Sequence, residues 1–141
     1  MAGYSGTPLP KKLGISEGSR VALIGAPDDF ETQLTPLPDD VSFLPRVVAP
    51  VDVILFFARS RAELAKRFAS IAVKLAANGG FWIAWPKKTS GVATDLTESI
   101  VRETGLANKL VDNKVCAVDD TWSGLRFVVP VASRKNWPPD K

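Results

Sequence analysis

The feature that most constrains the fold is a strand pattern, a helix pattern and a second strand pattern that follow one another within residues 51–88. Residues 51–57 are apolar throughout, which is typical of a strand buried on both faces at the centre of a parallel sheet. Ser60 and Glu63 then form a capping box, in which we expect the Glu63 side chain to reach the backbone amide of Ser60. Such a succession predicts a parallel sheet with helices on its faces.

The helix after Ser60 has one apolar stripe and a clear stop signal. The stripe consists of positions spaced by four, three and four residues, namely Leu64, Phe68, Ile71 and Leu75. Asn78-Gly79-Gly80 is expected to end this helix. Residues 81–85 then predict a strand with Phe81, Ile83 and Trp85 on one face and Trp82 and Ala84 on the other.

The remaining patterns extend the sheet at both ends of the chain. We expect strands at 20–24, 41–44, 114–118 and 124–129, and helices at 8–13, 28–34 and 95–104, the last one capped by Thr94 or Asp95 and ended by Gly105. The last two strands predict an antiparallel hairpin. The short connection 45–51 must return the chain without a helix. The fold class is therefore a three-layer α/β sandwich of about six strands, with a parallel centre and a C-terminal antiparallel hairpin.

One domain is expected over residues 1–132. Residues 1–17 form an N-terminal arm, whose short helix is capped by Thr7, ended by Gly14 and placed as a lid on one sheet edge. Residues 133–141, which include Pro138-Pro139, are expected to be a flexible tail.

Composition excludes several classes of site. The chain has no histidine and a single cysteine, Cys116, so Ser-His-Asp catalysis and a zinc site are not expected, and a disulfide within the chain is impossible. The net charge of +3 is evenly mixed along the chain, which does not favour nucleic acid as a partner. No apolar run is long enough to span a membrane and no signal peptide is recognisable, so we expect a cytoplasmic protein.

The order of elements over residues 20–130 resembles a class I S-adenosylmethionine-dependent methyltransferase with its middle shortened. The best-matched pieces are residues 51–55 and 75–85, which resemble the fourth and fifth strands of that Rossmann-like family and the helix between them. The resemblance implies a cofactor near Gly25, Ala26 and Asp28. Here, however, the turn is Gly25-Ala26-Pro27, in which a Cβ and a missing amide hydrogen reduce backbone access to a cofactor.

Four segments also resemble a family of small bacterial proteins classed only as a domain of unknown function. They are residues 3–9, 85–88, 91–97 and 111–119, and together they span nearly the whole chain. This resemblance implies no activity.

Candidate ligand-binding residues lie where predicted strands end. Lys87, Lys88, Thr89 and Ser90 follow the strand 81–85, where backbone amides and the next helix would favour a phosphate-like anion, although the loop fits a solvated basic turn better. Gly25 lies in the first turn. Trp85 and Trp122 lie near loops, where their rings could stack on a base or pack in the core.

Other reactive residues have structural interpretations. Asp119 and Asp120 fit turn geometry better than a metal site, and Cys116 fits a small buried hydrophobe better than a nucleophile. Asp52 begins a strand and is expected to make a structural hydrogen bond.

The sequence favours a non-enzymatic binding or regulatory module on a degenerate methyltransferase-like scaffold, without a cofactor, that binds a small anionic ligand or a protein. The alternative is a methyltransferase that uses S-adenosylmethionine. A third interpretation is a homodimer that buries Trp122 and Trp137, whereas the first two allow a monomer.

Overall fold

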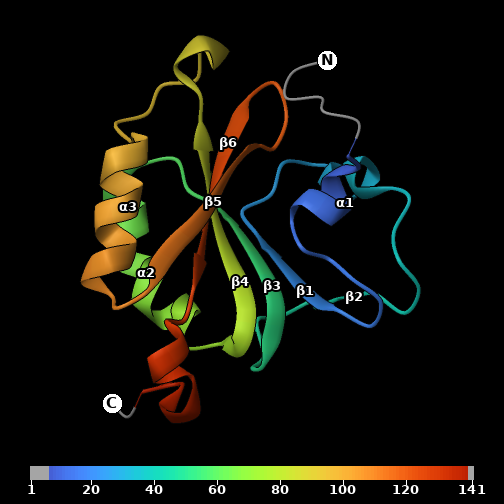
Figure 1. The fold of residues 1–141 in the computed structure, drawn as a ribbon. Coiled ribbons are helices and arrows are strands. Elements are labelled where there is room, and N and C mark those ends of the chain that lie inside the picture. The colour runs from blue at the N-terminus through green and yellow to red at the C-terminus, as the bar shows by residue number, and fades with distance from the viewer. Residues whose placement is uncertain (1–6, 140–141) are drawn as a thin grey trace.

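The computed structural model describes residues 7–139, which form a six-stranded sheet with helices on both faces (Figure 1). The strands are β1 (Arg20–Ile24), β2 (Ser42–Phe43), β3 (Val51–Phe57), β4 (Leu75–Pro86), β5 (Val111–Ala117) and β6 (Trp122–Val128). Their order is β2-β1-β3-β4-β6-β5. The first four strands are parallel, and β6 is antiparallel to both β4 and β5. The predicted fold class is confirmed.

Two hydrophobic clusters separate the layers, as the alternation in β4 predicts. Phe81, Ile83 and Trp85 belong to one cluster, together with apolar residues of α2 (Arg61–Ala72) and α3 (Glu98–Ala107). Trp82 and Ala84 belong to the other cluster, which also contains residues that follow α1 (Leu9–Lys12) or lie in the 3-10 helix η1 (Phe30–Leu34). Figure 1 shows α2 and α3 on one side of the sheet and α1 on the other.

The connection from β2 to β3 contains no helix. Residues 44–50 carry the chain from the outer edge past β1, so β3 pairs with β1 on the side opposite β2. The predicted connection without a helix is therefore confirmed, and the carboxyl ends of β1 and β3 lie next to each other.

Helix α2 begins as predicted but ends earlier. Ser60 is its N-cap, and its Oγ accepts a hydrogen bond from the Glu63 amide at 3.1 Å. Glu63 Oε1 accepts from the amide of Arg59 (2.9 Å), so the predicted bond to the Ser60 amide is wrong by one residue. The last helical residue is Ala72, and Leu75 already pairs with Val51 in the sheet.

Gly79 and Gly80 lie within β4, so the prediction that they end the helix is wrong. Pairing between β3 and β4 shifts from Val51–Leu75 to Val53–Gly80. A Cβ at Gly79 would lie 2.7 Å from the Asp52 carbonyl oxygen, and a Cβ at Gly80 would overlap the Arg126 guanidinium. These glycines therefore permit close approach of backbone and side chain at a strand irregularity.

Helix α3 begins and ends about three residues later than predicted. Thr97 is its N-cap and accepts from the Ile100 amide at 3.2 Å. Gly105 lies inside the helix rather than at its end, because the Phe127 ring packs where a Cβ would be. Thr94 and Asp95 do not cap α3.

Helix α1 lies over a face of the sheet, not over an edge. Its N-cap is Pro8 and carries no side-chain hydrogen bond, so the predicted Thr7 cap is wrong, whereas Gly14 follows the helix at φ +84° as expected. The indole nitrogen of the fully buried Trp82 donates to the Leu13 carbonyl at 2.9 Å. Residues 1–6 of the predicted arm lie outside the described residues.

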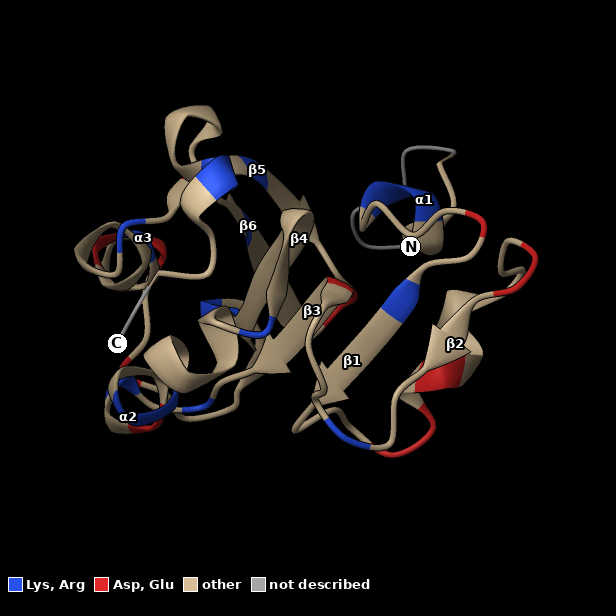
Figure 2. Ribbon diagram, turned by 90° about the horizontal axis from the view of Figure 1, so that it is seen from below, with Lys and Arg blue, Asp and Glu red and all other residues tan. Residues whose placement is uncertain are grey.

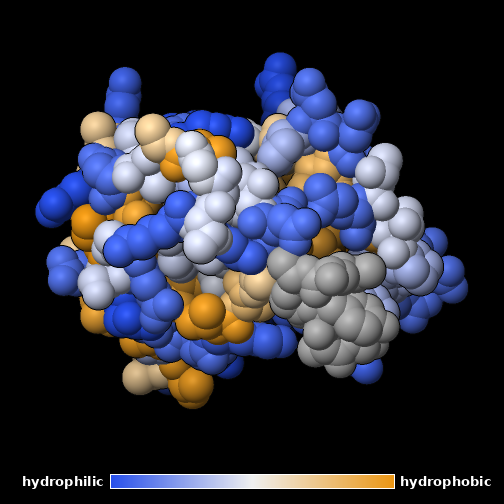
Figure 3. Space-filling view, turned by 90° about the horizontal axis from the view of Figure 1, so that it is seen from above, coloured by the Kyte–Doolittle hydropathy of each residue, from blue (hydrophilic) through white to orange (hydrophobic). Residues whose placement is uncertain are grey.

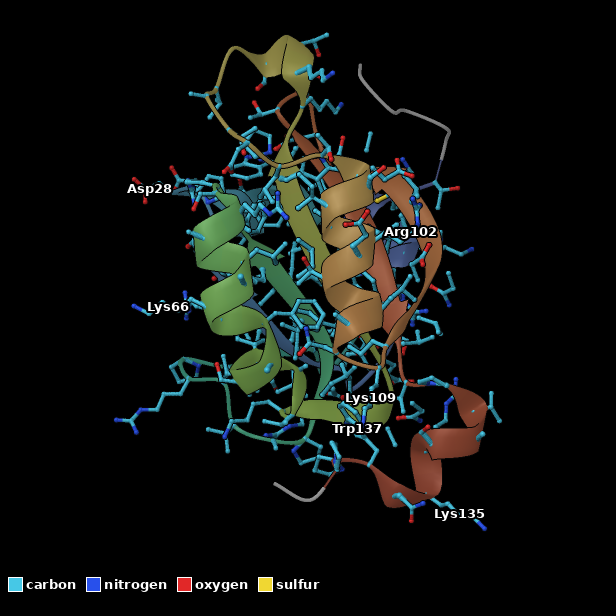
Figure 4. The ribbon with its side chains drawn as sticks, turned by 90° about the vertical axis from the view of Figure 1, so that its left-hand side faces the viewer. Asp28, Lys66, Arg102, Lys109, Lys135 and Trp137 are labelled. Atoms are coloured by element: carbon cyan, nitrogen blue, oxygen red, sulfur yellow. The ribbon has the colours of Figure 1, made fainter. Side chains whose placement is uncertain are left out.

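The C-terminal segment contacts the sheet through residues 131–137, and the flexibility predicted for residues 133–141 stays a prediction. The 3-10 helix η3 (Val131–Asn136) follows β6, and Arg134 Nε donates to the Val129 carbonyl at 3.1 Å. The Trp137 indole nitrogen donates to the Leu75 carbonyl at 2.8 Å, at the end of the sheet seen at the bottom of Figure 4. Apolar contact with the α2–α3 cluster, which the sequence pattern did not reveal, holds this segment.

No helix among residues 7–139 is long and apolar enough to cross a bilayer. Helices α2 and α3 each carry both basic and acidic residues (Figure 2).

Candidate functional site

The order of the parallel strands places a topological switch point at the carboxyl ends of β1 and β3. The chain leaves β1 toward β2 on one side and returns to β3 on the other side, so the strand order reverses at this point. In open α/β sheets, ligands bind at such a point, outside the carboxyl ends of the strands. We refer to the strand ends at Gly25 and Phe57 as the switch-point crevice.

Gly25, one of the predicted site residues, does lie at this crevice. It is exposed and has φ +68°, and a Cβ there would lie 3.0 Å from the Phe57 carbonyl oxygen. Both the conformation and the space favour glycine at this turn.

Arg59 occupies the crevice in this structure. Its Nη1 donates to the carbonyl of Gly25 (3.1 Å) and to that of Phe57 (3.4 Å). Its guanidinium carbon lies 5.0 Å from the centroid of the Trp122 ring, which is a cation–π arrangement. The guanidinium therefore joins the ends of two strands and covers an aromatic ring.

The backbone around Arg59 is fixed from both sides. Its amide donates to Glu63, and its carbonyl accepts from Thr94 Oγ1 at 2.8 Å. The next amide, that of Arg61, donates to Asp95 Oδ1 at 2.7 Å, so Asp95 satisfies the start of α2 instead of α3. These contacts hold the origin of the Arg59 side chain beside the crevice.

Trp122 lies beneath Arg59 as part of the core. It is 5% exposed and packs edge-on against Phe57, with ring centroids 5.0 Å apart and an interplanar angle of 89°. Asp119 Oδ1 accepts from the amides of Thr121 and Trp122, which confirms its role in turn geometry. The predicted ligand-stacking ring is therefore a core residue, and the Arg59 guanidinium lies over it.

A cleft of about 470 Å³ opens beside β1, next to the crevice. Its walls are apolar at Leu23, Ala26 and Phe30, and acidic at Asp29 and Glu31. Asp28, which directly precedes the lining residue Asp29 in the chain, lies at the same end of the molecule as the start of α2 (Figure 4). Seen from this end, the surface has several separate hydrophobic areas among hydrophilic residues (Figure 3).

The predicted basic loop is not at the crevice. Lys87, Lys88, Thr89 and Ser90 form a turn containing the 3-10 helix η2 (Lys88–Ser90), which projects beyond the sheet at the top of Figure 1. Ser90 Oγ donates to the Lys87 carbonyl at 2.6 Å and accepts from the Val92 amide at 3.1 Å. Helix α3 begins only at Glu98, so no helix N-terminus supports this loop. Anion binding there stays a prediction.

The other predicted positions have structural roles. Trp85 is 6% exposed and lies in the α2–α3 cluster, so it offers no open ring face. Asp52 Oδ2 accepts from the Arg20 amide at 2.8 Å, which confirms the predicted structural hydrogen bond. Cys116 is half-buried, and burial raises the pKa of its thiol, which disfavours the nucleophilic thiolate. Residues 7–139 contain no group of three or more Cys, Asp or Glu side chains that could hold a metal.

Sequence reasoning missed Arg59. The available signal was its position directly after a central strand and before the Ser60 cap, where an arginine can reach the strand ends. Of the two residues proposed for a dimer interface, Trp122 is buried within its own chain, and Trp137 is half-buried and donates to the Leu75 carbonyl. The homodimer stays a prediction.

Comparisons with known proteins agree with the fold. No protein-family model and no curated protein matches the chain. Among solved structures, a fibrillarin pre-rRNA processing protein of Methanococcus jannaschii matches at 12% identity and TM-score 0.55, over 89% of this chain and 70% of that chain. Magnesium protoporphyrin IX methyltransferase of Synechocystis PCC 6803, with bound S-adenosylmethionine, matches at 8% identity and TM-score 0.56, over 86% and 74%.

A tRNA methyltransferase of B. subtilis matches at 11% identity and TM-score 0.52, over 92% of this chain and 68% of that chain. The chain therefore has the methyltransferase-like α/β fold. At these identities the likeness concerns the fold alone, and membership of the small bacterial family suggested by the sequence stays a prediction.

Proposed function

We propose that the protein binds S-adenosylmethionine at the switch-point crevice and acts as a small methyltransferase. The observation that carries this proposal is the open cleft beside Gly25, at the strand-order reversal of a methyltransferase-like sheet. The Synechocystis enzyme with the same fold holds S-adenosylmethionine. The proposal replaces the non-enzymatic module favoured by the sequence as our first choice.

The residues present fit the adenosine part of such a cofactor. Gly25 provides a backbone turn that a Cβ would obstruct. Leu23, Ala26 and Phe30 give apolar walls suited to a base, and the carboxylates of Asp29 and Glu31 suit ribose hydroxyl groups. Because Pro27 has no amide hydrogen, the turn offers fewer backbone donors than a glycine-rich turn.

When bound, S-adenosylmethionine supplies a methyl group on a sulfonium centre. The role of this chain is to hold the cofactor and its substrate, to orient them and to exclude water. Positioning of this kind contributes much of the rate of a group transfer. Any proton acceptor must be a carboxylate, lysine, cysteine or tyrosine, because the chain has no histidine.

A second candidate is the binding module without catalysis. The specific observation in its favour is the Arg59 guanidinium, which already satisfies the strand-end carbonyls in the crevice. In this candidate Arg59 replaces a cofactor as a structural element.

Isothermal titration calorimetry of the full chain with S-adenosylmethionine and S-adenosylhomocysteine tests the first candidate. We expect stoichiometric binding, weakened roughly tenfold or more by Gly25→Ala, because the added Cβ disturbs the turn. Gly91→Ala is the matched control, since Gly91 also has a positive φ of +80° but no atom within 4 Å of an added Cβ and lies away from the crevice.

Two outcomes contradict the methyltransferase proposal. Absence of binding at millimolar concentration in the wild-type chain overturns it. Binding that is seen only in Arg59→Met supports the second candidate, because the arginine would then be what closes the site.

A further inference from the structure

A second cavity lies at the opposite, amino-terminal edge of the sheet. It has a volume of about 230 Å³ and is lined mainly by polar groups, among them Ser16, Glu17, Asp52, Asn78 and Arg126. It is smaller than the cavities that hold drug-sized molecules, which span about 300–1,000 Å³. The size and lining of the cavity therefore suit a small polar ligand.

Arg126 lacks a counter-ion among residues 7–139. Its Nη1 donates to Asn113 Oδ1 at 3.4 Å, and no residue in the range 7–139 accepts a hydrogen bond from Nε or Nη2. The guanidinium lies against Gly80 and Gly14, both without side chains. Burial, and secondarily Arg134, lowers the pKa of Arg126. A partly buried cation of this kind favours an anion from outside the chain.

Two carboxylates, those of Glu17 and Asp52, line the same cavity. Neither Glu17 nor Asp52 forms an ion pair with Arg126, and the two ion pairs within residues 7–139 both belong to Arg102. Asp52 Oδ2 accepts from the Arg20 amide, which leaves Oδ1 available, and Glu17 is exposed. Opposite charges thus line one small space without forming an ion pair with one another.

We propose that this cavity binds a small zwitterion of the α-amino-acid class. Its carboxylate lies on the Nε and Nη2 donors of Arg126, and its ammonium group lies between Glu17 and Asp52. Arginine offers a planar pair of donors that matches a carboxylate, and both charges of the ligand would replace solvent around groups that the chain leaves unpaired. The site does not depend on the proposed function, because the switch-point crevice is at the other end of the strands.

Calorimetric and ¹⁵N NMR titrations of the full chain with glycine and L-serine test the proposal, with acetate and methylamine as single-charge controls. We expect saturable binding of an amino acid, with amide shifts confined to residues 14–19, 78–80 and 126. Acetate and methylamine should each bind at least about tenfold more weakly, because each makes only one of the two charged contacts.

Arg126→Met should abolish binding. Glu17→Gln provides a second variant at an exposed position where folding is not at risk, and it should weaken binding roughly tenfold. Glu103→Gln, at an exposed glutamate on α3 that belongs to neither proposed site, is the matched control and should bind like the wild type. The proposal is overturned if neither amino acid binds, if acetate binds as well as glycine, or if both Arg126→Met and Glu17→Gln bind unchanged.

Discussion

Two arginines at opposite ends of the sheet differ in how their guanidinium groups are hydrogen-bonded. Arg59, at the carboxyl ends of the strands, donates to two backbone carbonyls and lies over Trp122. Arg126, near the amino ends, has a single neutral acceptor at 3.4 Å and no carboxylate partner among residues 7–139. Residues 7–139 satisfy the Arg59 guanidinium at the strand ends but give the Arg126 guanidinium one long hydrogen bond.

This difference shows that the burial of an arginine and the number of its hydrogen-bond acceptors are separate properties. Arg59 is exposed yet has two strand-end carbonyl acceptors, whereas Arg126 is partly buried yet poorly satisfied. An unpaired charge costs free energy in proportion to its desolvation, so Arg126 is the stronger indication of an external ligand. At the carboxyl edge, a ligand has to displace Arg59 before it can reach the carbonyls.

The largest effect should come from removing the ring on which Arg59 rests. Trp122→Ala should lower the free energy of unfolding by about 3–5 kcal/mol, because it leaves a cavity beside Phe57 and removes the cation–π contact. Urea denaturation measures it, with the exposed Val131→Ala as control, expected within about 0.5 kcal/mol of wild type. A loss under about 1 kcal/mol would show that the carboxyl edge does not depend on this ring.

The amino edge should be sensitive at Gly79. Gly79→Ala should lower the free energy of unfolding by about 1–3 kcal/mol, because the added Cβ would meet the Asp52 carbonyl, which is backbone and cannot turn away. Asn78→Ala, an exposed neighbour, serves as the control. Equal stability of the two variants would mean that β3 and β4 can separate locally without cost.

Asp95→Ala tests how Arg59 is kept in place. Loss of the 2.7 Å bond to the Arg61 amide should cost about 1 kcal/mol, the usual effect of removing a helix cap. Hydrogen exchange of the Arg61 amide should accelerate, while that of Glu63, which donates to Ser60 Oγ, should not. Unchanged exchange at Arg61 would contradict the capping role.

The smallest effects should separate the two arginines directly. Arg59→Met should lower the free energy of unfolding by about 0.5–1 kcal/mol, through loss of the contact with Trp122. Arg126→Met should leave stability unchanged or raise it, because it removes a partly buried charge that forms no ion pair within residues 7–139. Parallel thermal and urea denaturation in ligand-free buffer compares them. A larger loss for Arg126→Met would overturn the comparison.

Local patterns predicted most of the sheet. The apolar run 51–57 and the alternation at 81–85 each reflect burial over a few neighbouring residues. They identified β3 and part of β4, and the alternation also assigned the two faces of β4. The Ser60 cap was predicted for the same reason, since Ser60 and Glu63 lie within one helical turn.

The errors occurred where a distant residue decides the local structure. Gly105 does not end α3, because the Phe127 ring from β6 takes its Cβ space, and Gly80 does not end α2, because Arg126 lies on it. Neither contact leaves a signal in the neighbouring sequence. Both guanidinium positions were missed for the same reason: an arginine in a sequence does not reveal which carbonyls or cavities its long side chain reaches.

The Trp82 indole determines how the chain can be shortened in the laboratory. Its nitrogen is fully enclosed and its acceptor is the Leu13 carbonyl. A protein produced from Arg20 onward would keep β1 to β6. The Trp82 indole nitrogen would nevertheless lose its acceptor, and the hydrophobic cluster around Trp82 would be exposed to water. We therefore expect such a truncated product to aggregate, and expression designs should retain the segment that precedes the first strand.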